Sequence, residues 1–430
     1  MKIKIIGAGL AGCEAAVYLA ERGVEVELYD IKPESFTPAH NDKNFGELVC
    51  SNSLKSDDIY GNACGLLKEE MRTIGSLMTE AAQSTRIPAG GALAVDRQNF
   101  AEYITQKIKS YKNITVICKE VTVVPDEWCI VATGPLTTDA LSESIKGICG
   151  GGLHFYDASA PIVSADSLDY NECFFGGRYG KGGDDYINCP LNKEEYLSFV
   201  NGLVSAEKVV LHEFEKREIF EGCMPVEVLA ARGFDSLRFA MLKPVGLSDK
   251  DGNRFYAVLQ LRKENADGTA YNLVGCQTNL KFPEQKRVFS LIPALKNAEY
   301  LRYGVMHRNT YLNSPECLNA DFSLKQNGTV FFAGQITGVE GYVESAASGL
   351  LAAVNVYRKL CGKPSLVPDN TTVIGALAAH VSTKSGNFQP MNANFGILKP
   401  AEKIIKDKKQ RYAYLAERAL AVIREFKENL

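Results

Sequence analysis

The stretch KIKIIGAGLAGCEAAVYLAERGVEVELYD, residues 2–30, decides the fold of this chain. It begins with a short apolar strand pattern over Ile3–Ile6 and turns through three glycines. An apolar helix pattern then runs to about Arg22 and ends at Gly23, and a second strand pattern closes in Asp30. A strand, a GxGxxG turn, a helix and a second strand ending in an acid form the dinucleotide-binding βαβ unit.

Each part of this unit has a physical reason. The first glycine makes the tight turn, the second lets the backbone approach a pyrophosphate, and the third lets helix and strand pack closely. The helix N-terminus offers unpaired N–H groups to an anion, and the acid accepts hydrogen bonds from a ribose. We therefore expect the following residues to bind a dinucleotide: Gly7, Ala8, Gly9, Leu10, Ala11, Gly12 and Asp30.

Two further segments indicate FAD rather than NAD alone. Residues 128–135 form a strand ending in Ala-Thr-Gly, similar to the return strand of two-domain flavoproteins. Residues 330–335 form another strand with a glycine exit, and residues 338–349 lead into a small-residue helix, as in their second flavin segment. The additional FAD-binding residues expected from these segments are Gly134, Gly334, Gln335, Gly341, Tyr342 and Glu344. Stacking on the flavin and core packing are both open for the Tyr342 ring.

The flavin segments lie at opposite ends of the chain, so the residues between them form an insertion. We expect an α/β fold: a Rossmann-like, glutathione-reductase-type flavoprotein with two dinucleotide-binding domains and an inserted α/β domain. The predicted FAD-binding domain is discontinuous, with residues 1–160 and 300–430, and the insertion covers residues 161–299. A glycine-rich stretch at 176–183 lacks P-loop spacing and is predicted to be a loop, either mobile or facing RNA.

Composition sets the remaining limits. The chain has 430 residues and a formal net charge of −3, so no overall basic charge indicates nucleic acid. There is no signal-peptide pattern and no apolar run long enough to span a membrane, which predicts a cytoplasmic protein. The twelve cysteines include no CxxC pair, so we expect reduced thiols and no metal site. No obligatory protein partner is indicated.

Two cysteines stand in unusual surroundings. Cys50 follows an apolar run that breaks into small polar residues, Ser51-Asn52-Ser53. Cys223 lies between a glycine and Met224-Pro225 in a turn context. These contexts favour exposure, but without geometry neither cysteine can be assigned a chemical role.

Several longer motifs resemble one family, the folate- and FAD-dependent tRNA (uracil-5-)-methyltransferases of bacteria, which are relatives of the glucose-inhibited division proteins. The resemblance runs from residue 1 to about 400. Its motifs are at 7–12, 47–55, 222–225, 302–310, 334–349 and 387–396.

This resemblance implies that methylenetetrahydrofolate supplies a one-carbon unit, reduced FAD supplies electrons, and NADPH or NADH reduces the flavin. The implied product is ribothymidine in the tRNA T-loop. Uracil C5 becomes nucleophilic once a thiolate adds to C6, and its proton must then leave to a base. By similarity Cys223 is the expected nucleophile and Cys50 the expected base, and the two roles can also be exchanged.

Three residues are weaker candidates for binding folate or RNA: His307, Arg97 and Lys409. For His307 a satisfied core position is equally open, and Lys409 belongs to a lysine-rich segment that also suits a solvated helix face. Three alternative functions remain open. They are the same chemistry on a ribosomal RNA uridine, an FAD-dependent oxidoreductase of a small metabolite, and a non-catalytic flavoprotein that binds RNA.

Overall fold

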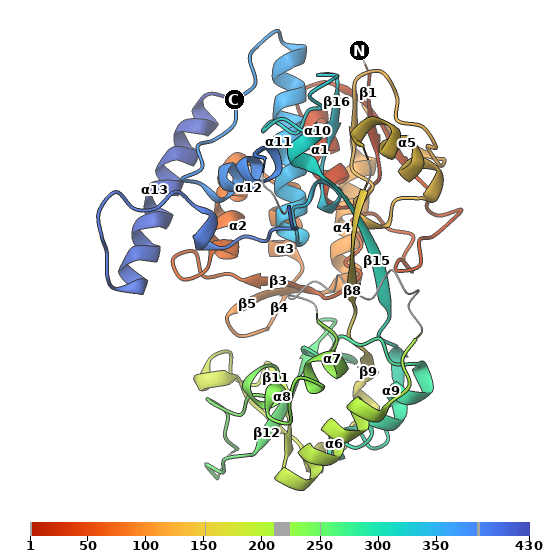
Figure 1. Ribbon diagram of the computed structural model, residues 1–430, viewed down its shortest axis with the longest axis vertical. Coiled ribbons are helices and arrows are strands. Elements are labelled where there is room, and N and C mark those ends of the chain that lie inside the picture. The colour runs from red at the N-terminus through yellow and green to blue at the C-terminus, as the bar shows by residue number, and fades with distance from the viewer. Residues whose placement is uncertain (1, 151, 210–223, 250, 385–387) are drawn as a thin grey trace.

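The structure is a computed structural model that describes residues 2–150, 152–209, 224–249, 251–384 and 388–430. It has two parts, stacked along the long axis of the molecule (Figure 1). We call them the parallel-sheet body, built around strands β1, β2, β6, β7 and β16, and the antiparallel-sheet body, built around β9–β14. Cys223 lies outside the described residues.

The parallel-sheet body contains the βαβ unit predicted from residues 2–30. Its five strands run in the order β16-β7-β1-β2-β6, and all neighbouring pairs are parallel. The strands are β1 (Lys2–Ile6), β2 (Glu25–Asp30), β6 (Ile114–Cys118), β7 (Cys129–Val131) and β16 (Val330–Phe332). This order brings the carboxyl ends of β1, β7 and β16, which are far apart in sequence, to one edge of the sheet.

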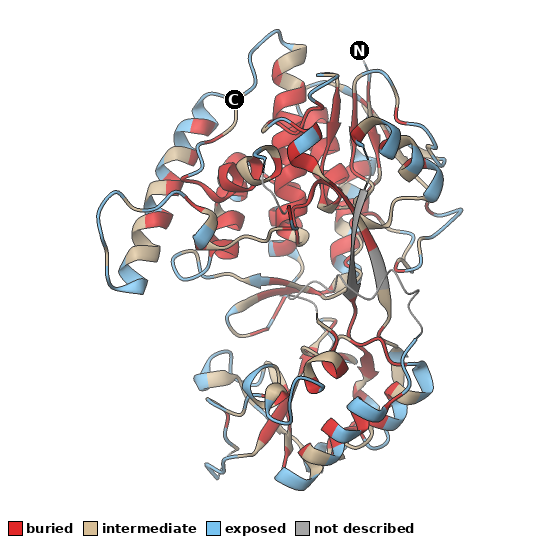
Figure 2. Cartoon of the chain, viewed as in Figure 1, coloured by how far each residue is buried: buried red, intermediate tan, exposed pale blue. Residues whose placement is uncertain are grey.

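Two helices form the buried centre of this body. Every residue of α1 (Leu10–Ala20) is buried, and α1 packs against α11 (Tyr342–Leu360) (Figure 2). The contact is backbone to backbone, since a Cβ on Gly349 would lie 2.2 Å from the Ala11 carbonyl oxygen. The remaining helices of the body are α2 (Ala63–Ile74), α3 (Leu77–Ser84), α4 (Arg97–Ser110), α5 (Asp139–Cys149), α10 (Ser314–Cys317), α12 (Val373–Ser382) and α13 (Lys408–Glu428).

A small sheet and a two-stranded ribbon lie toward the other body (Figure 1). The small sheet, in the order β3-β5-β4, consists of β3 (Ser53–Ser56), β4 (Arg86–Ile87) and β5 (Ala92–Val95). The ribbon pairs β8 (Gly152–Ala158) with β15 (Met306–Leu312) in antiparallel register. The chain therefore leaves the parallel-sheet body and returns to it along one ribbon.

The antiparallel-sheet body has its own hydrophobic core. Its six strands run in the order β10-β11-β12-β13-β9-β14, and every neighbouring pair is antiparallel. The strands are β9 (Ile162–Ser164), β10 (Phe174–Phe175), β11 (Tyr186–Leu191), β12 (Ala257–Lys263), β13 (Ala270–Leu273) and β14 (Tyr300–Arg302). The helices are α6 (Lys193–Ser205), α7 (Val226–Ala230), α8 (Ser236–Phe239) and α9 (Phe282–Phe289).

No helix within the described residues is long and apolar enough to cross a membrane.

Two buried carboxylates cap helices in the parallel-sheet body. The Glu14 carboxylate accepts hydrogen bonds from the first amides of α3, Leu77 at 3.0 Å and Met78 at 2.9 Å. The Glu70 carboxylate does the same for α12, accepting from Val373 at 2.8 Å and Ile374 at 2.9 Å. Burial raises the pKa of each carboxyl to about 7, although the backbone hydrogen bonds act in the opposite direction. A helix N-terminus favours such an acceptor.

We expect Glu70→Ala to lower the free energy of unfolding by about 2–3 kcal/mol, because two buried amides lose their acceptor. Urea denaturation at neutral pH measures this loss. The matched control is Glu69→Ala on the same helix, which removes only a partly exposed pair with Arg72 and should cost less than about 1 kcal/mol. Equal losses in the two variants would contradict the capping role.

Candidate dinucleotide cleft and cysteine site

A cleft opens at the carboxyl edge of the parallel sheet. Its empty space, including the open mouth, is about 1130 Å³, large enough for a dinucleotide-sized ligand. The residues that line it come from the glycine turn, the ends of β2, β6 and β7, and the start of α11. Of the residues predicted to bind the cofactor, Gly7, Ala8, Gly9, Leu10, Ala11, Asp30, Gly134, Gly334, Gln335 and Tyr342 line this cleft.

The glycine turn has the geometry that an anion needs. Gly7 has φ +101°, and a Cβ there would lie 2.5 Å from the Ala132 carbonyl oxygen. A Cβ on Gly12 would lie 1.9 Å from the Gly7 carbonyl oxygen, so Gly12 sets the close packing of α1 on the turn. Gly9 faces open space, and no side chain caps α1 there. The residues present therefore fit a pyrophosphate at the helix N-terminus.

Asp30 connects the turn to the end of β2. Its Oδ2 accepts a hydrogen bond from the Ala8 amide at 2.7 Å, and its Oδ1 accepts one from the Lys32 amide at 2.9 Å. A carboxylate has about four acceptor sites, so both oxygens can still accept a ribose hydroxyl.

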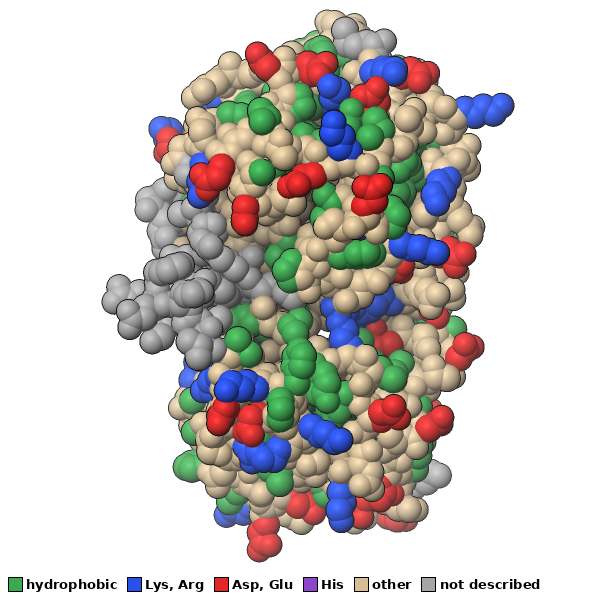
Figure 3. All heavy atoms as spheres, turned by 90° about the vertical axis from the view of Figure 1, so that its right-hand side faces the viewer, with side chains coloured by type: hydrophobic (Ala, Val, Ile, Leu, Met, Phe, Trp, Pro, Cys, Tyr) green, Lys and Arg blue, Asp and Glu red, His purple; other side chains and the backbone are tan. Residues whose placement is uncertain are grey.

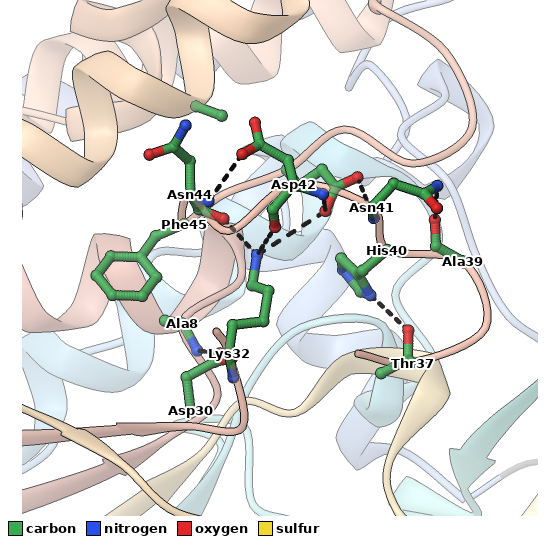
Figure 4. Close-up of polar contacts among 12 residues, drawn as sticks. Ala8, Asp30, Lys32, Thr37, Ala39, His40, Asn41, Asp42, Asn44 and Phe45 are labelled. Carbon is green, nitrogen blue, oxygen red and sulfur yellow. Dashed lines mark hydrogen bonds and ion pairs between the residues drawn. The ribbon is translucent and has the colours of Figure 1, made fainter. Parts of the chain in front are cut away.

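A loop over residues 37–47 forms one wall of the cleft, and no motif in residues 37–46 predicts this position (Figure 4). The Lys32 ammonium group donates to the carbonyl oxygens of Asp42, at 3.2 Å, and Asn44. The same group lies 3.9 Å from the buried Glu47 carboxylate. These contacts fix the loop against β2.

His40 lies in this loop and lines the cleft. Its Nδ1 shares a hydrogen bond of 2.5 Å with the Thr37 hydroxyl. Burial lowers the pKa of His40 to about 4, and the nearby Lys32 ammonium acts in the same direction. His40 is therefore neutral at physiological pH.

The predicted second flavin segment divides into two groups. Gly334 and Gln335 line the cleft, where the Gly334 amide donates to the Ser348 hydroxyl at 2.7 Å. Gly341 and Glu344 are not among the lining residues. Gly341 precedes α11 with φ +120°, and the buried Glu344 carboxylate accepts from the Lys55 ammonium at 3.1 Å and from the Ala393 amide at 2.9 Å.

Tyr342, which lines the cleft, is hydrogen-bonded to the backbone of Cys50. The Tyr342 hydroxyl accepts hydrogen bonds from the Cys50 amide at 2.6 Å and the Ser51 amide at 3.2 Å. The Cys50 thiol lies 3.8 Å from the Ala158 carbonyl oxygen at the end of β8. Burial raises the pKa of the Tyr342 phenol, so its hydroxyl stays protonated and can accept both amides.

The structure gives Arg97 a different position from the one expected of a phosphate or RNA contact. Its guanidinium group donates to the Leu48 carbonyl oxygen at 2.6 Å and to the Glu264 carboxylate at 2.9 Å. Only 17% of its side chain is exposed. Burial is the largest single effect and disfavours the charged form, but Glu264, Tyr342 and Cys50 together outweigh it and raise the pKa of Arg97.

The other two weak candidates are Lys409 and His307. Lys409 is exposed in the first turn of α13, on the far side of the parallel-sheet body from β15 (Figure 1). The backbone of His307 lies in β15, paired with Asp157 of β8. Among the described residues no group of three or more His, Cys, Asp or Glu side chains could hold a metal ion.

The sheet order, glycine turn and paired flavin segments define a Rossmann-type flavoprotein fold. A crystal structure of Aquifex aeolicus GidA has the same fold, with a TM-score of 0.73 at 15% identity, covering 100% of this chain and 73% of that one. A second crystal form of that protein gives a TM-score of 0.71 at 16% identity, with coverage of 99% and 76%.

Residues 2–364 match the family described as glucose inhibited division protein A, and the chain belongs to that family. It is 55% identical over 428 residues to a protein of Acetivibrio thermocellus, covering 99% of this chain and 98% of the relative. It is also 55% identical over 423 residues to a protein of Geobacter sulfurreducens, covering 97% of each. Both relatives are named methylenetetrahydrofolate–tRNA-(uracil-5-)-methyltransferase TrmFO.

We expect Gly9→Ala to fold normally but to lose dinucleotide affinity by about tenfold or more, because its methyl group would enter the space left for the anion. Adenine dinucleotide released from the purified protein measures the loss. The control is Gly147→Ala in α5, which also has open space around it and lies outside the cleft lining. Full dinucleotide content in Gly9→Ala would show that the anion lies elsewhere.

We also expect a pH effect from His40. Its folded pKa of about 4 lies below the ordinary 6.5, so the unfolded chain binds the proton first as pH falls. The stability from neutral His40 is complete above about pH 6.5 and is lost as pH falls toward 4. An imidazole NMR signal assigned through His40→Gln should titrate near pH 4, and titration near 6.5 would contradict the buried position.

Proposed function

We propose that this chain is a methylenetetrahydrofolate- and FADH2-dependent tRNA (uracil-5-)-methyltransferase that forms ribothymidine in the T-loop. The names of relatives aligned over nearly the whole chain support this activity. The observation that carries it is the bond between the Cys50 amide and Tyr342, because Tyr342 lines the dinucleotide cleft. A cysteine held beside a flavin site suits uracil methylation, which needs a thiol as nucleophile or base.

In this proposal the parallel-sheet body binds FAD. The N-terminus of α1 and Gly9 hold the pyrophosphate, Asp30 holds the adenosine ribose, and Gly134, Gly334 and Gln335 contact the flavin end. Reduced FAD supplies the electrons for methylation, and NADPH or NADH from the cytoplasm restores it. The domain division proposed is residues 1–160 and 300–430 for FAD, with 161–299 inserted.

The two cysteines have separate roles in the reaction with uracil. The Cys223 thiolate adds to C6 and makes C5 nucleophilic, Cys50 takes the C5 proton after the carbon is attached, and the C6–S bond breaks again when the C5–C6 double bond of the product is restored. The position of Cys50 supports its part in this scheme, because its thiol lies 3.8 Å from the Ala158 carbonyl oxygen, on a segment whose backbone is bonded to Tyr342 of the cleft.

The junction of the two bodies suits an RNA substrate. Lysine and arginine side chains lie there on the face drawn in Figure 3, beside a hydrophobic patch of the antiparallel-sheet body. Cationic side chains attract the phosphate backbone, and apolar or aromatic surface accepts unstacked bases. A local cluster of this kind is compatible with the net charge of −3.

The experiment that tests the proposal is methyl incorporation from labelled methylenetetrahydrofolate and NADPH into an unmodified tRNA transcript. Label at the T-loop uridine is the expected result. Label only in ribosomal RNA would keep the chemistry and change the substrate. No label in either RNA, with bound flavin still reduced by NADPH, would favour a small-metabolite oxidoreductase.

We expect Cys223→Ala and Cys50→Ala each to reduce methylation by at least about 100-fold, because the first removes the nucleophile and the second removes the base. With RNA containing 5-fluorouridine, Cys50→Ala should still form a covalent adduct and Cys223→Ala should not. Denaturing gel electrophoresis measures the adduct, and exposed Cys361→Ala serves as the control. A full adduct in Cys223→Ala would reverse the assignment.

A further inference from the structure

Side chains of the antiparallel-sheet body hold the segment that carries Cys50. The end of β12 approaches residues 48–52 with two charged side chains, Arg262 and Glu264, which are 7% and 5% exposed. Both belong to the inserted part of the sequence, whereas Cys50 belongs to the parallel-sheet body. The contact therefore joins the two bodies at the candidate catalytic cysteine.

Arg262 makes the direct contact. Its Nε donates to the Asn52 side-chain oxygen at 3.0 Å, and its Nη2 donates to the Ser51 hydroxyl at 2.7 Å. Asn52 is fully buried, and its amide group donates to the carbonyl oxygens of Val95 at 3.0 Å and Lys263 at 2.8 Å. The two residues after Cys50 are thus fixed by side-chain bonds, with little room to move.

Glu264 acts through Arg97. One Glu264 oxygen lies 2.9 Å from Arg97 Nε and 2.8 Å from Arg97 Nη2. Arg97 in turn donates to the Leu48 carbonyl oxygen, two residues before Cys50. The segment is therefore held on both sides of the cysteine, and Tyr342 holds it at the cysteine itself.

The charges in this cluster are unequal. Arg97 and Arg262 are both buried beside one carboxylate, Glu264, and both interact electrostatically with Cys50. Burial lowers the pKa of Arg262, which shows that its charged form is costly at this position. A buried arginine serving packing alone would be better replaced by an apolar side chain. Its hydrogen bonds to Ser51 and Asn52 offset part of this cost and hold the cation within electrostatic range of Cys50.

We infer that Arg262 is a positioning residue for Cys50, and that Glu264 supports the same segment through Arg97. The inference rests on the proposed function for its catalytic consequence, but its structural part does not. Arg262 fixes the backbone of residues 50–52 so that the thiol stays at the edge of the dinucleotide cleft. The antiparallel-sheet body thereby contributes to catalysis without touching the cofactor.

Two measurements on the flavin-loaded full chain test the inference with Arg262→Met. Hydrogen exchange of the peptide covering residues 48–54 should become at least about tenfold faster, since its amides lose their fixed acceptor geometry. The kcat for methylation should fall at least about tenfold, with KM for tRNA unchanged within about twofold. A role in overall stability alone would not separate kcat from KM in this way.

Arg238→Met is the matched control. Arg238 lies in the same body, where its side chain donates to the Tyr256 carbonyl oxygen, packs over the Tyr256 ring and pairs with Asp235. It should leave both measurements unchanged. If Arg262→Met does not fold, Ser51→Ala removes one acceptor of Arg262 while leaving the guanidinium in place, and it should show the same effects at smaller size.

The outcomes separate the two proposals. If no RNA is methylated by the unaltered protein, the proposed function fails, while hydrogen exchange still tests whether Arg262 positions residues 50–52. If Arg262→Met or Ser51→Ala exchanges at the same rate as Arg238→Met, the positioning role is overturned. Faster exchange with unchanged kcat would also overturn it, because the segment would then move without consequence for the reaction.

Discussion

The close contact between Gly12 of helix α1 and the Gly7 carbonyl oxygen is the constraint on which the cleft depends. The absence of a Cβ on Gly12 lets α1 start directly on the turn, with its first amides directed at open space beside Gly9. The same helix meets α11 through Gly349, so the second flavin segment lies as near to the turn as the backbones permit. A side chain at Gly12 would push α1 away from the glycine turn, and a side chain at Gly349 would separate α1 from α11, which lie more than 300 residues apart in the sequence.

Buried charged groups then fix the loops around this centre. Glu14 and Glu70 hold the starts of α3 and α12. The Lys68 ammonium donates to the carbonyl oxygens of Leu54 and Ser56, at 2.7 Å and 2.6 Å, which anchors β3 just after the cysteine segment. Each group is desolvated at a cost, so each is stable only because hydrogen bonds to the backbone replace its water. The starts of α3 and α12 and the position of β3 therefore depend on hydrogen bonds to buried charged groups rather than on local propensity.

Sequence could predict the parts whose roles follow from local chemistry. The glycines and Asp30 stand in one βαβ unit, where spacing alone determines what each does. The family resemblance likewise predicts a catalytic role for Cys50. Arg97 and Glu344 are expected to bind ligands from their place in the sequence, and the structure adds ion-pair partners that the sequence does not indicate, Glu264 for Arg97 and Lys55 for Glu344. Both partners are more than 150 residues away, and no local pattern encodes such a pairing.

Lys32 and His40 line the cleft, and no sequence motif predicts either of them. His40 lines the cleft because it belongs to the 37–47 loop, and Lys32 lines it just after β2 and anchors that loop. The loop is also held by the Arg302 guanidinium, which donates to the Ala39 carbonyl oxygen at 3.1 Å. Arg302 lies in β14, at the edge of the antiparallel sheet, and Arg262 lies in β12 of the same sheet. One sheet therefore supports the cleft wall through Arg302 and the cysteine segment through Arg262. Such double support requires the two bodies to keep one relative position, because a shift that relaxed either contact would disturb the other.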